Sequence, residues 1–97
     1  MRKYNCIDKL AKLLDEANIP YERNPLWDGE QIRVGEFDAV CHKYSNGYDE
    51  DLLEIMGALT EEENQKDQVK GLLTPEEVAK RFEYCYRNNT DTYCEEE

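Results

Sequence analysis

The stretch Glu30-Gln-Ile-Arg-Val-Gly-Glu-Phe-Asp-Ala-Val-Cys-His-Lys-Tyr44 decides the fold. Apolar and polar side chains alternate on both sides of its Gly35-Glu36 link, and a period of two is typical of strands with one buried face. The link itself is short enough to be a tight turn. The sequence therefore predicts neighbouring antiparallel strands over residues 30–34 and 37–44.

Weaker strand signals flank this pair on either side. Residues 21–24 form a candidate strand, and residues 25–29 then supply a turn that begins with proline. On the other side, Ser45-Asn-Gly47 favours a turn because Asn-Gly readily adopts positive φ. Residues 52–56 follow as an apolar strand, so the four segments predict an antiparallel meander.

Helical spacing appears at both ends of the chain. After a cap at Asn5, apolar residues recur every three or four positions up to residue 17, and Pro20 forbids continuation of that helix. The second helix has a clear start, since Thr74 can cap it, Pro75 suits its first position and Glu77 closes a capping box. Its expected inner stripe is Val78, Phe82 and Cys85, and its expected end is Asn88-Asn89.

These elements predict one α+β domain over residues 1–97: an N-terminal helix, a four-stranded antiparallel meander and a C-terminal helix. Both helices are expected to cover one face of the sheet. Residues 60–70 are polar and are expected to form an exposed loop or a frayed helical turn. Residues 89–97 are expected to form an acidic tail. No apolar run approaches the length of a membrane span and no signal peptide is evident, so a cytoplasmic location is expected.

Negative charge is concentrated in the second half of the chain. Residues 1–48 carry 7 basic and 8 acidic side chains, a net of −1, whereas residues 49–97 carry 5 basic and 15 acidic side chains, a net of −10. Direct nucleic-acid or anionic-membrane binding is disfavoured, because phosphate contacts need Lys or Arg. Complementary charge instead favours a basic protein surface as partner. A solubilising acidic face is the alternative.

The four cysteines are the candidate metal site. Without a secretory signal, an even number of cysteines indicates thiols or metal ligands rather than disulfides. Zinc takes four sulfur or nitrogen ligands in a tetrahedron, although no Cys-x-x-Cys pair is present. Buried thiols without a metal are the alternative, which Cys94 in the acidic tail fits least. The predicted zinc ligands are Cys6, Cys41, Cys85 and Cys94.

Catalytic patterns are weak, and the protein is predicted not to be an enzyme. Asp38 and Glu54 on adjacent strands resemble the metal-binding pair of restriction-type nucleases, but Met56 stands where those enzymes need a lysine. Cys41 and His42 are neighbours on a strand, so their side chains should point to opposite faces and cannot form a nucleophile–base pair.

Aromatic residues form the last group of candidate functional residues. Trp27, Tyr44 and Tyr48 lie in or near loops at one end of the expected sheet. Tyr and Trp anchor interfaces because they bury much area at low entropic cost. The other reading is that part of the aromatic set completes a small core.

Three segments resemble small proteins of phages and prophages in Gram-positive bacteria. They are Tyr4-Asn-Cys-Ile-Asp-Lys-Leu10, Leu52-Leu-Glu-Ile-Met-Gly57 and Val69-Lys-Gly-Leu-Leu-Thr-Pro-Glu-Glu-Val-Ala-Lys-Arg-Phe82. In size and acidity the chain is similar to the anti-CRISPR proteins. That resemblance implies an inhibitor that binds a host defence protein, such as a type II CRISPR effector nuclease, and blocks DNA loading on its basic channel.

The acidic loops are the candidate contacts for such a partner: Asp49, Glu50, Asp51, Glu61, Glu62 and Glu63. Two alternatives stay open. A module that binds a nucleotide signal would need basic groups converging on a pocket, for which Arg23, Arg33, His42 and Lys43 are best placed. A structural or regulatory phage component would self-assemble.

Overall fold

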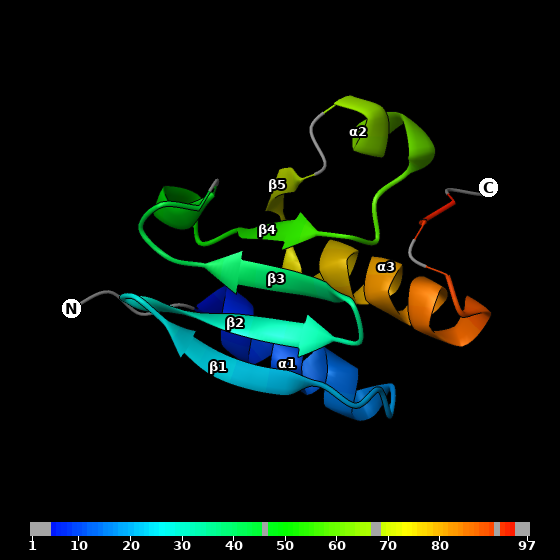
Figure 1. Ribbon diagram of the computed structural model, residues 1–97. Coiled ribbons are helices and arrows are strands. Elements are labelled where there is room, and N and C mark those ends of the chain that lie inside the picture. Colours follow the sequence, from blue (N-terminus) through cyan, green and yellow to red (C-terminus); the bar gives the residue numbers. More distant parts are fainter. Residues whose placement is uncertain (1–4, 46, 67–68, 91, 95–97) are drawn as a thin grey trace.

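The computed structural model describes residues 5–45, 47–66, 69–90 and 92–94, and it has the expected α+β architecture (Figure 1). A helix opens the chain, an antiparallel sheet follows, and a longer helix closes it. In chain order the elements are α1 (Asn5–Glu16), β1 (Glu22–Leu26), β2 (Gly29–Val34), β3 (Phe37–Cys41), the 3-10 turn η1 (Tyr48–Glu50), β4 (Leu53–Met56), α2 (Glu61–Lys66), β5 (Lys70–Leu73) and α3 (Pro75–Asn88).

Within the described residues the sheet is an antiparallel meander, as predicted, but with five strands in the order β1-β2-β3-β4-β5. The strand absent from the prediction is β5, which pairs Leu73 with Leu53 and Lys70 with Ile55. Between those two pairs β5 has one residue more than β4. This irregularity accompanies a left-handed backbone at Leu72 (φ 59°), as in a β-bulge, and the Leu72 side chain is exposed.

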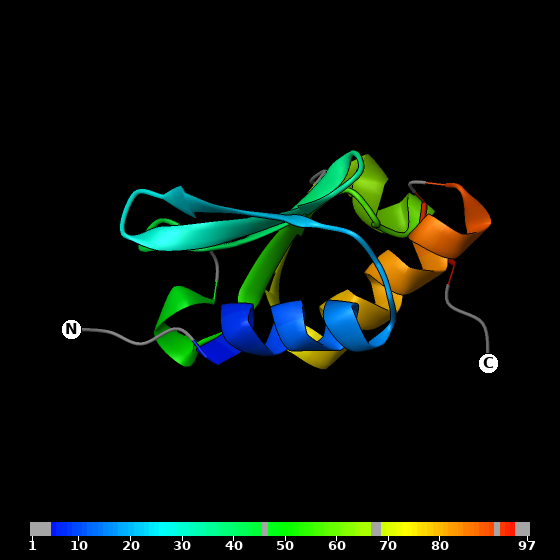
Figure 2. The same cartoon turned by 90° about the horizontal axis from the view of Figure 1, so that it is seen from below.

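Both long helices lie on the same face of the sheet and pack against each other (Figure 2). The side chains between these layers form the core, which includes Leu10, Leu14, Ile32, Ile55 and Phe82. In the part of the chain that the structure describes, no helix lies over the opposite face of β2, β3 and β4. An antiparallel sheet can leave one face to solvent in this way.

Two strand boundaries differ from the prediction. The strand expected over residues 37–44 ends at Cys41, because the chain turns back on itself from His42 to Ser45. The turn expected from Pro25 to Gly29 consists only of Trp27 and Asp28. Pro25 fits within β1 because β1 is an edge strand, where a missing N–H costs no ladder bond.

The predicted helix ends are confirmed. Asn18, just after α1, has the left-handed conformation typical of a helix stop (φ 60°). Thr74 and Glu77 form the reciprocal capping box at the start of α3, and Asn89 is its left-handed C-cap. Local chemistry alone therefore places both long helices.

Residues 60–70, expected to form an exposed loop or a frayed helical turn, contain the short helix α2. Its start is a second capping box, in which the Thr60 amide donates to Glu63 Oε1 at 3.0 Å and the Glu63 amide donates to Thr60 Oγ1 at 3.2 Å. After α3, the tail returns to the body: the Tyr93 amide donates to Leu59 O at 2.8 Å, and the Tyr93 side chain is buried. Among the described residues, no helix combines the length and apolar character needed to cross a bilayer.

Candidate functional site

The open face of the sheet carries two rows of side chains that run across the strands. In one row, Val40 on β3 lies between Gln31 on β2 and Glu54 on β4. In the next row, Asp38 lies between Arg33 and Met56. A strand that faces water on one side usually shows polar groups there. Here, the apolar side chains of Val40 and Met56 lie among the polar and charged ones.

These side chains, except that of Arg33, line a groove of about 370 Å³ that ends against an aromatic corner. We define the open-face groove by its lining residues: Leu26, Trp27, Gln31, Asp38, Val40, His42, Tyr44, Glu54, Ile55, Met56 and Val69. Trp27, Tyr44 and Met56 are 70%, 69% and 58% exposed. Three large apolar side chains so exposed on one groove indicate an interaction site.

The corner consists of three rings that meet edge to face. The ring centroids of Trp27 and His42 are 4.7 Å apart with an interplanar angle of 73°, and those of Trp27 and Tyr44 are 5.5 Å apart at 87°. Such pairs are favoured by the ring quadrupoles. The rings therefore support one another while most of the Trp27 and Tyr44 surface faces solvent.

Hydrogen bonds between backbone and side-chain groups fix the two loops that carry these rings. The Lys43 amide donates to Asp28 Oδ1 at 3.0 Å, which joins the β1–β2 turn to the loop after β3. The Tyr44 amide donates to His42 Nδ1 at 3.1 Å. Ser45 Oγ donates to His42 O at 2.8 Å and closes the turn.

The turn that holds Trp27 depends on a close backbone approach. A Cβ at Gly29 would lie 1.8 Å from Cys41 O, so only glycine lets β2 begin against the end of β3. Trp27 itself has φ 54°, a conformation that is costly for a bulky side chain. Because the Trp27 side chain is mostly exposed, core packing does not account for this strain.

Two carboxylates give the groove its charge. Burial raises the pKa of Asp38, while the Gln31 amide, which donates to Asp38 Oδ2 at 2.8 Å, and nearby Arg33 act to lower it. None of the described residues that line the groove is Lys or Arg. Two cations lie at its rim: Arg33 Nε donates to Gly35 O at 3.2 Å, and Lys43 Nζ lies 5.2 Å from the Tyr44 ring centroid.

The six acidic residues predicted as partner contacts do not form one patch. Asp49 and Glu50 are exposed on η1, and Glu61 and Glu62 are exposed on α2, at the two ends of β4. Among the described residues, no cation pairs with Asp49, Glu50 or Glu61, while Glu62 lies 3.7 Å from Lys66 Nζ. Asp51 is directed inward, where its Oδ1 accepts from the Cys6 amide at 3.3 Å.

Glu63 is likewise engaged within the molecule. It binds the buried Arg81 through two contacts, Nη1 to Oε1 at 2.8 Å and Nη2 to Oε2 at 3.2 Å. The hydrogen bond from Arg81, with that from the Thr60 amide, holds the pKa of Glu63 at about 2 despite partial burial. The Arg81 guanidinium also lies 4.9 Å from the Tyr93 ring centroid, so α2, α3 and the tail meet at this residue.

Two of the four predicted metal ligands come together, and they meet a third group that was not predicted as a ligand. The ligand atoms of Cys6, Cys41 and Asp51 all lie within 4.8 Å of one another. Ligand atoms about 2.3 Å from a tetrahedral zinc lie roughly 3.8 Å apart, so a small contraction would allow a shared ion. The hydrogen bond with Cys41 and burial raise the pKa of the Cys6 thiol. This group could hold a metal ion.

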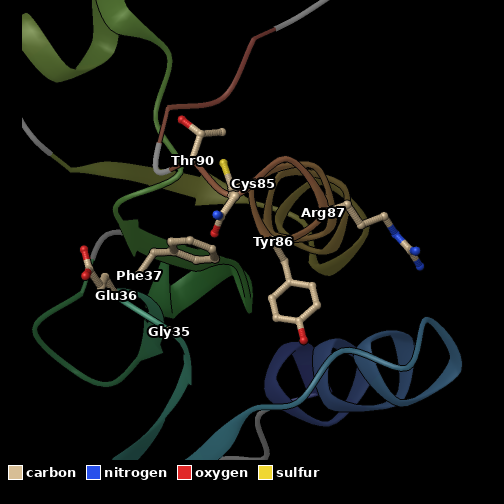
Figure 3. A pocket seen from close by; sticks show the side chains of 8 residues that line it. Gly35, Glu36, Phe37, Cys85, Tyr86, Arg87 and Thr90 are labelled. Atoms are coloured by element: carbon tan, nitrogen blue, oxygen red, sulfur yellow. The ribbon is translucent and has the colours of Figure 1, made fainter.

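Cys85 and Cys94 lie outside that group. Cys85 lines a hollow between the β2–β3 turn and the C-terminal part of α3, together with Phe37 (Figure 3). Cys41 is four residues further along β3, which is about 13 Å of strand. Cys94 is exposed in the tail and lines a hollow beside Tyr84 and Tyr93. The four thiols therefore do not converge on one point.

The basic side chains considered for a nucleotide do not share a pocket. Arg23 pairs with Asp8 and Glu30, and Arg33 lines a shallow hollow with Tyr21. The hollow in Figure 3 includes Arg87, but its side chain points away and Arg87 Nε donates to Glu83 at 2.9 Å. These described side chains therefore give no support to a nucleotide-binding module.

No family model, curated protein or solved structure matches this chain. The support for the candidate site therefore comes from the geometry of this chain alone.

Proposed function

We propose that this protein is a small acidic inhibitor, encoded by a phage or prophage, that binds a basic surface of a host defence protein. The partner we propose is a type II CRISPR effector nuclease, with the inhibitor occupying the surface on which DNA is loaded. The resemblance of three segments to phage proteins supports a phage or prophage origin. The open-face groove supports the mode of action.

The observation that carries the proposal is the exposure of apolar and acidic groups on one uncovered sheet face. Trp27, Tyr44 and Met56 supply area that would be buried on binding, and Asp38 and Glu54 supply charge. Aromatic anchors surrounded by charge that matches the partner are typical of protein interfaces. The net charge of −11 favours a basic partner and disfavours nucleic acid.

The proposed partner presents the complementary chemistry. An RNA-guided nuclease holds its heteroduplex and displaced strand in positively charged channels. A domain that covers such a channel with carboxylates competes with phosphates for the same Lys and Arg residues. The exposed acids Asp49, Glu50, Glu61 and Glu62, at either end of β4, would add long-range attraction around the groove.

The test is titration calorimetry of the purified chain into a guide-loaded type II nuclease at low and at moderate salt. We expect a one-to-one complex that weakens as salt rises, and loss of target-DNA binding by the nuclease in a mobility assay. Absence of a complex at low salt, with DNA binding unchanged, would remove this partner from the proposal.

We further propose that the ion held by Cys6, Cys41 and Asp51 is zinc. Two thiolates and a carboxylate are ligands that zinc accepts, and both thiols are buried where an ion would bridge α1 to β3. Thiols must lose their protons to bind, and the raised pKa of Cys6 opposes this in the absence of metal. Zinc affinity should therefore increase with pH.

Metal analysis of protein produced with zinc tests this assignment. About one zinc per chain is expected, and it should be lost in Cys41→Ser but retained in Cys85→Ser and Cys94→Ser. At a zinc concentration of about 100 Kd, the metal should add about 3 kcal/mol to the free energy of unfolding. Equal metal content in all three variants would exclude the Cys6–Cys41–Asp51 group as the site.

A further inference from the structure

We infer that the zinc site proposed at Cys6, Cys41 and Asp51 leaves one coordination position open, and that this position takes a neutral imidazole from outside the chain. The inference rests on the proposed zinc site and specifies what the metal would bind. It does not depend on the nuclease as partner. Imidazole is the group that a histidine side chain carries, so a histidine of another chain and a small imidazole compound both supply it.

The first reason is the number of donors. Structural zinc sites have four protein ligands, whereas three protein ligands leave a position for a ligand from solution. The ligand atoms of Cys6, Cys41 and Asp51 lie within 4.8 Å of one another, and no fourth Cys, His, Asp or Glu among the described residues joins them. The remaining thiols and the single histidine lie elsewhere in the described structure: Cys85 and Cys94 in separate hollows beside α3, and His42 against the Trp27 ring.

The second reason is access from solvent. We define the helix-start pocket as a hollow of about 550 Å³ where α1 and α3 begin, with a lining that includes Cys6, Asp8, Lys9, Asp51, Thr74 and Glu76. Two of the three ligand residues therefore line it. Cys6 and Cys41 are buried, but Asp51 is only partly buried, so water reaches the group from the Asp51 side. An incoming ligand would approach the metal through this pocket.

The other carboxylates of the helix-start pocket are engaged with cations. Asp8 pairs with Arg23, and Glu76 Oε2 lies 3.7 Å from Lys9 Nζ. Neither carboxylate belongs to the group of close ligand atoms. The described lining of the pocket therefore supplies no further zinc ligand of the usual kinds.

The third reason is charge, which selects the class of ligand. Two thiolates and one carboxylate outweigh the charge of a zinc ion, so the loaded site is net negative. Asp8 and Glu76 add negative charge at the pocket. An anionic ligand would be repelled there, whereas a neutral nitrogen donor brings no charge of its own. Imidazole nitrogen is a ligand that zinc readily accepts, so the site favours imidazole over an anion such as azide.

The experiment loads the full chain, without a histidine tag, with Co²⁺ and records its absorption spectrum. Thiolate-to-cobalt charge-transfer bands report that the cysteines hold the metal, and the visible ligand-field bands report the fourth ligand. Imidazole should shift the visible bands at a concentration at least about tenfold lower than azide does, with the thiolate bands retained. Visible bands that do not change at high imidazole, while the thiolate bands persist, would show a closed site and overturn the inference.

The two sources of imidazole are separated by a second titration. A capped peptide with one histidine is compared with its alanine counterpart and with free imidazole. A response to the histidine peptide at a concentration similar to that of imidazole assigns the position to a side chain of another protein. A response to free imidazole alone assigns it to a small molecule.

Cysteine variants test whether the chain fills the position itself. The thiolate band intensity and the imidazole response should be unchanged in Cys85→Ser and in Cys94→Ser, and circular dichroism confirms that both are folded. Loss of about a third of the thiolate intensity in either variant would show that a third cysteine occupies the position, which contradicts the inference. Absence of thiolate bands from the unaltered chain would remove the zinc proposal and this inference together.

Charge variants test where the ligand sits. Asp8→Asn with Glu76→Gln should narrow the preference for imidazole over azide by about threefold. Glu16→Gln with Glu36→Gln removes the same charge from exposed positions outside the pocket and should change the preference by less than about 1.5-fold. Equal narrowing in the two variants would contradict binding in the helix-start pocket.

Discussion

The Arg81 site and the open-face groove contain the same kinds of group but differ in what occupies them. At the first, the carboxylate of Glu63 and the ring of Tyr93 enclose a guanidinium that the chain itself supplies, and the side chain of Arg81 is only 8% exposed. At the second, Asp38, Glu54 and Trp27 line a groove whose described lining includes no Lys or Arg.

The difference is between a carboxylate that pairs with a buried guanidinium and carboxylates that lie on an uncovered face of the sheet. A buried ion pair contributes mainly because losing one partner leaves the other uncompensated. An exposed carboxylate such as that of Glu62 contributes little to stability. Net charge alone does not reveal this difference. Glu62 and Glu63 are neighbours that contribute the same charge, yet Glu63 pairs with the buried Arg81 and Glu62 is exposed.

Breaking the Arg81 site should give the largest effect on stability. Glu63→Gln leaves the buried guanidinium without its charge partner and should lower the free energy of unfolding by about 3 kcal/mol. Glu62→Gln, whose carboxylate is exposed, should stay within about 0.5 kcal/mol. Urea denaturation measures both, and equal effects would contradict the distinction between the two residues.

The same pair predicts how stability depends on acid. The pKa of Glu63 is lowered in the folded chain from 4.5 to about 2, so its contribution is fully present above pH 4.5 and is lost as the pH falls toward 2. Denaturation at intervals between these values should show a decline that is smaller in Glu63→Gln. A decline of the same size in the variant would assign the acid sensitivity to other carboxylates.

Trp27 should show the opposite behaviour, with an effect on binding and little on stability. Its side chain is mostly exposed and its backbone has φ 54°, so Trp27→Gly removes the ring and relieves strain together. The free energy of unfolding should change by less than about 1 kcal/mol, while affinity for the basic partner should fall at least about tenfold. A large loss of stability would show that the corner is part of the core.

Asp51 combines a structural role with a candidate metal role, and a conservative change can separate them. Asn keeps an oxygen for the Cys6 amide at the start of α1 and tolerates the φ of 59° at this position. Asp51→Asn should therefore alter the stability of the metal-free protein by less than about 0.5 kcal/mol while weakening zinc binding. Unchanged zinc affinity would remove Asp51 from the ligand set.

Local chemistry predicted much of this fold. The capping box at Thr74 and Glu77 and the alternation around Gly35-Glu36 are signals within a few residues, and the structure confirms the elements they mark. Strand β5 was absent from the prediction because its four residues include Gly71 and a left-handed Leu72. Helix α2 had a readable signal, the same Thr-x-x-Glu pattern at Thr60, which its many charges obscured.

The candidate sites were predicted only in part, because they depend on long-range contacts. Trp27 and Tyr44 were expected near one end of the sheet, but the Asp28–Lys43 hydrogen bond that joins their loops has no sequence signature. Cys6 and Cys41 were named as ligands together, whereas Asp51 became their neighbour only through its contact with the start of α1. The engagement of Glu63 with Arg81, 18 residues away, was likewise not apparent from composition.

The most direct test of the account is titration calorimetry of a guide-loaded type II nuclease with two charge-matched variants. One is Asp38→Asn with Glu54→Gln on the open face, and the other is Glu16→Gln with Glu76→Gln on the helix layer. We predict at least about a tenfold loss of affinity for the first and less than about twofold for the second. Equal losses would contradict the claim that the open face of the sheet is the binding surface.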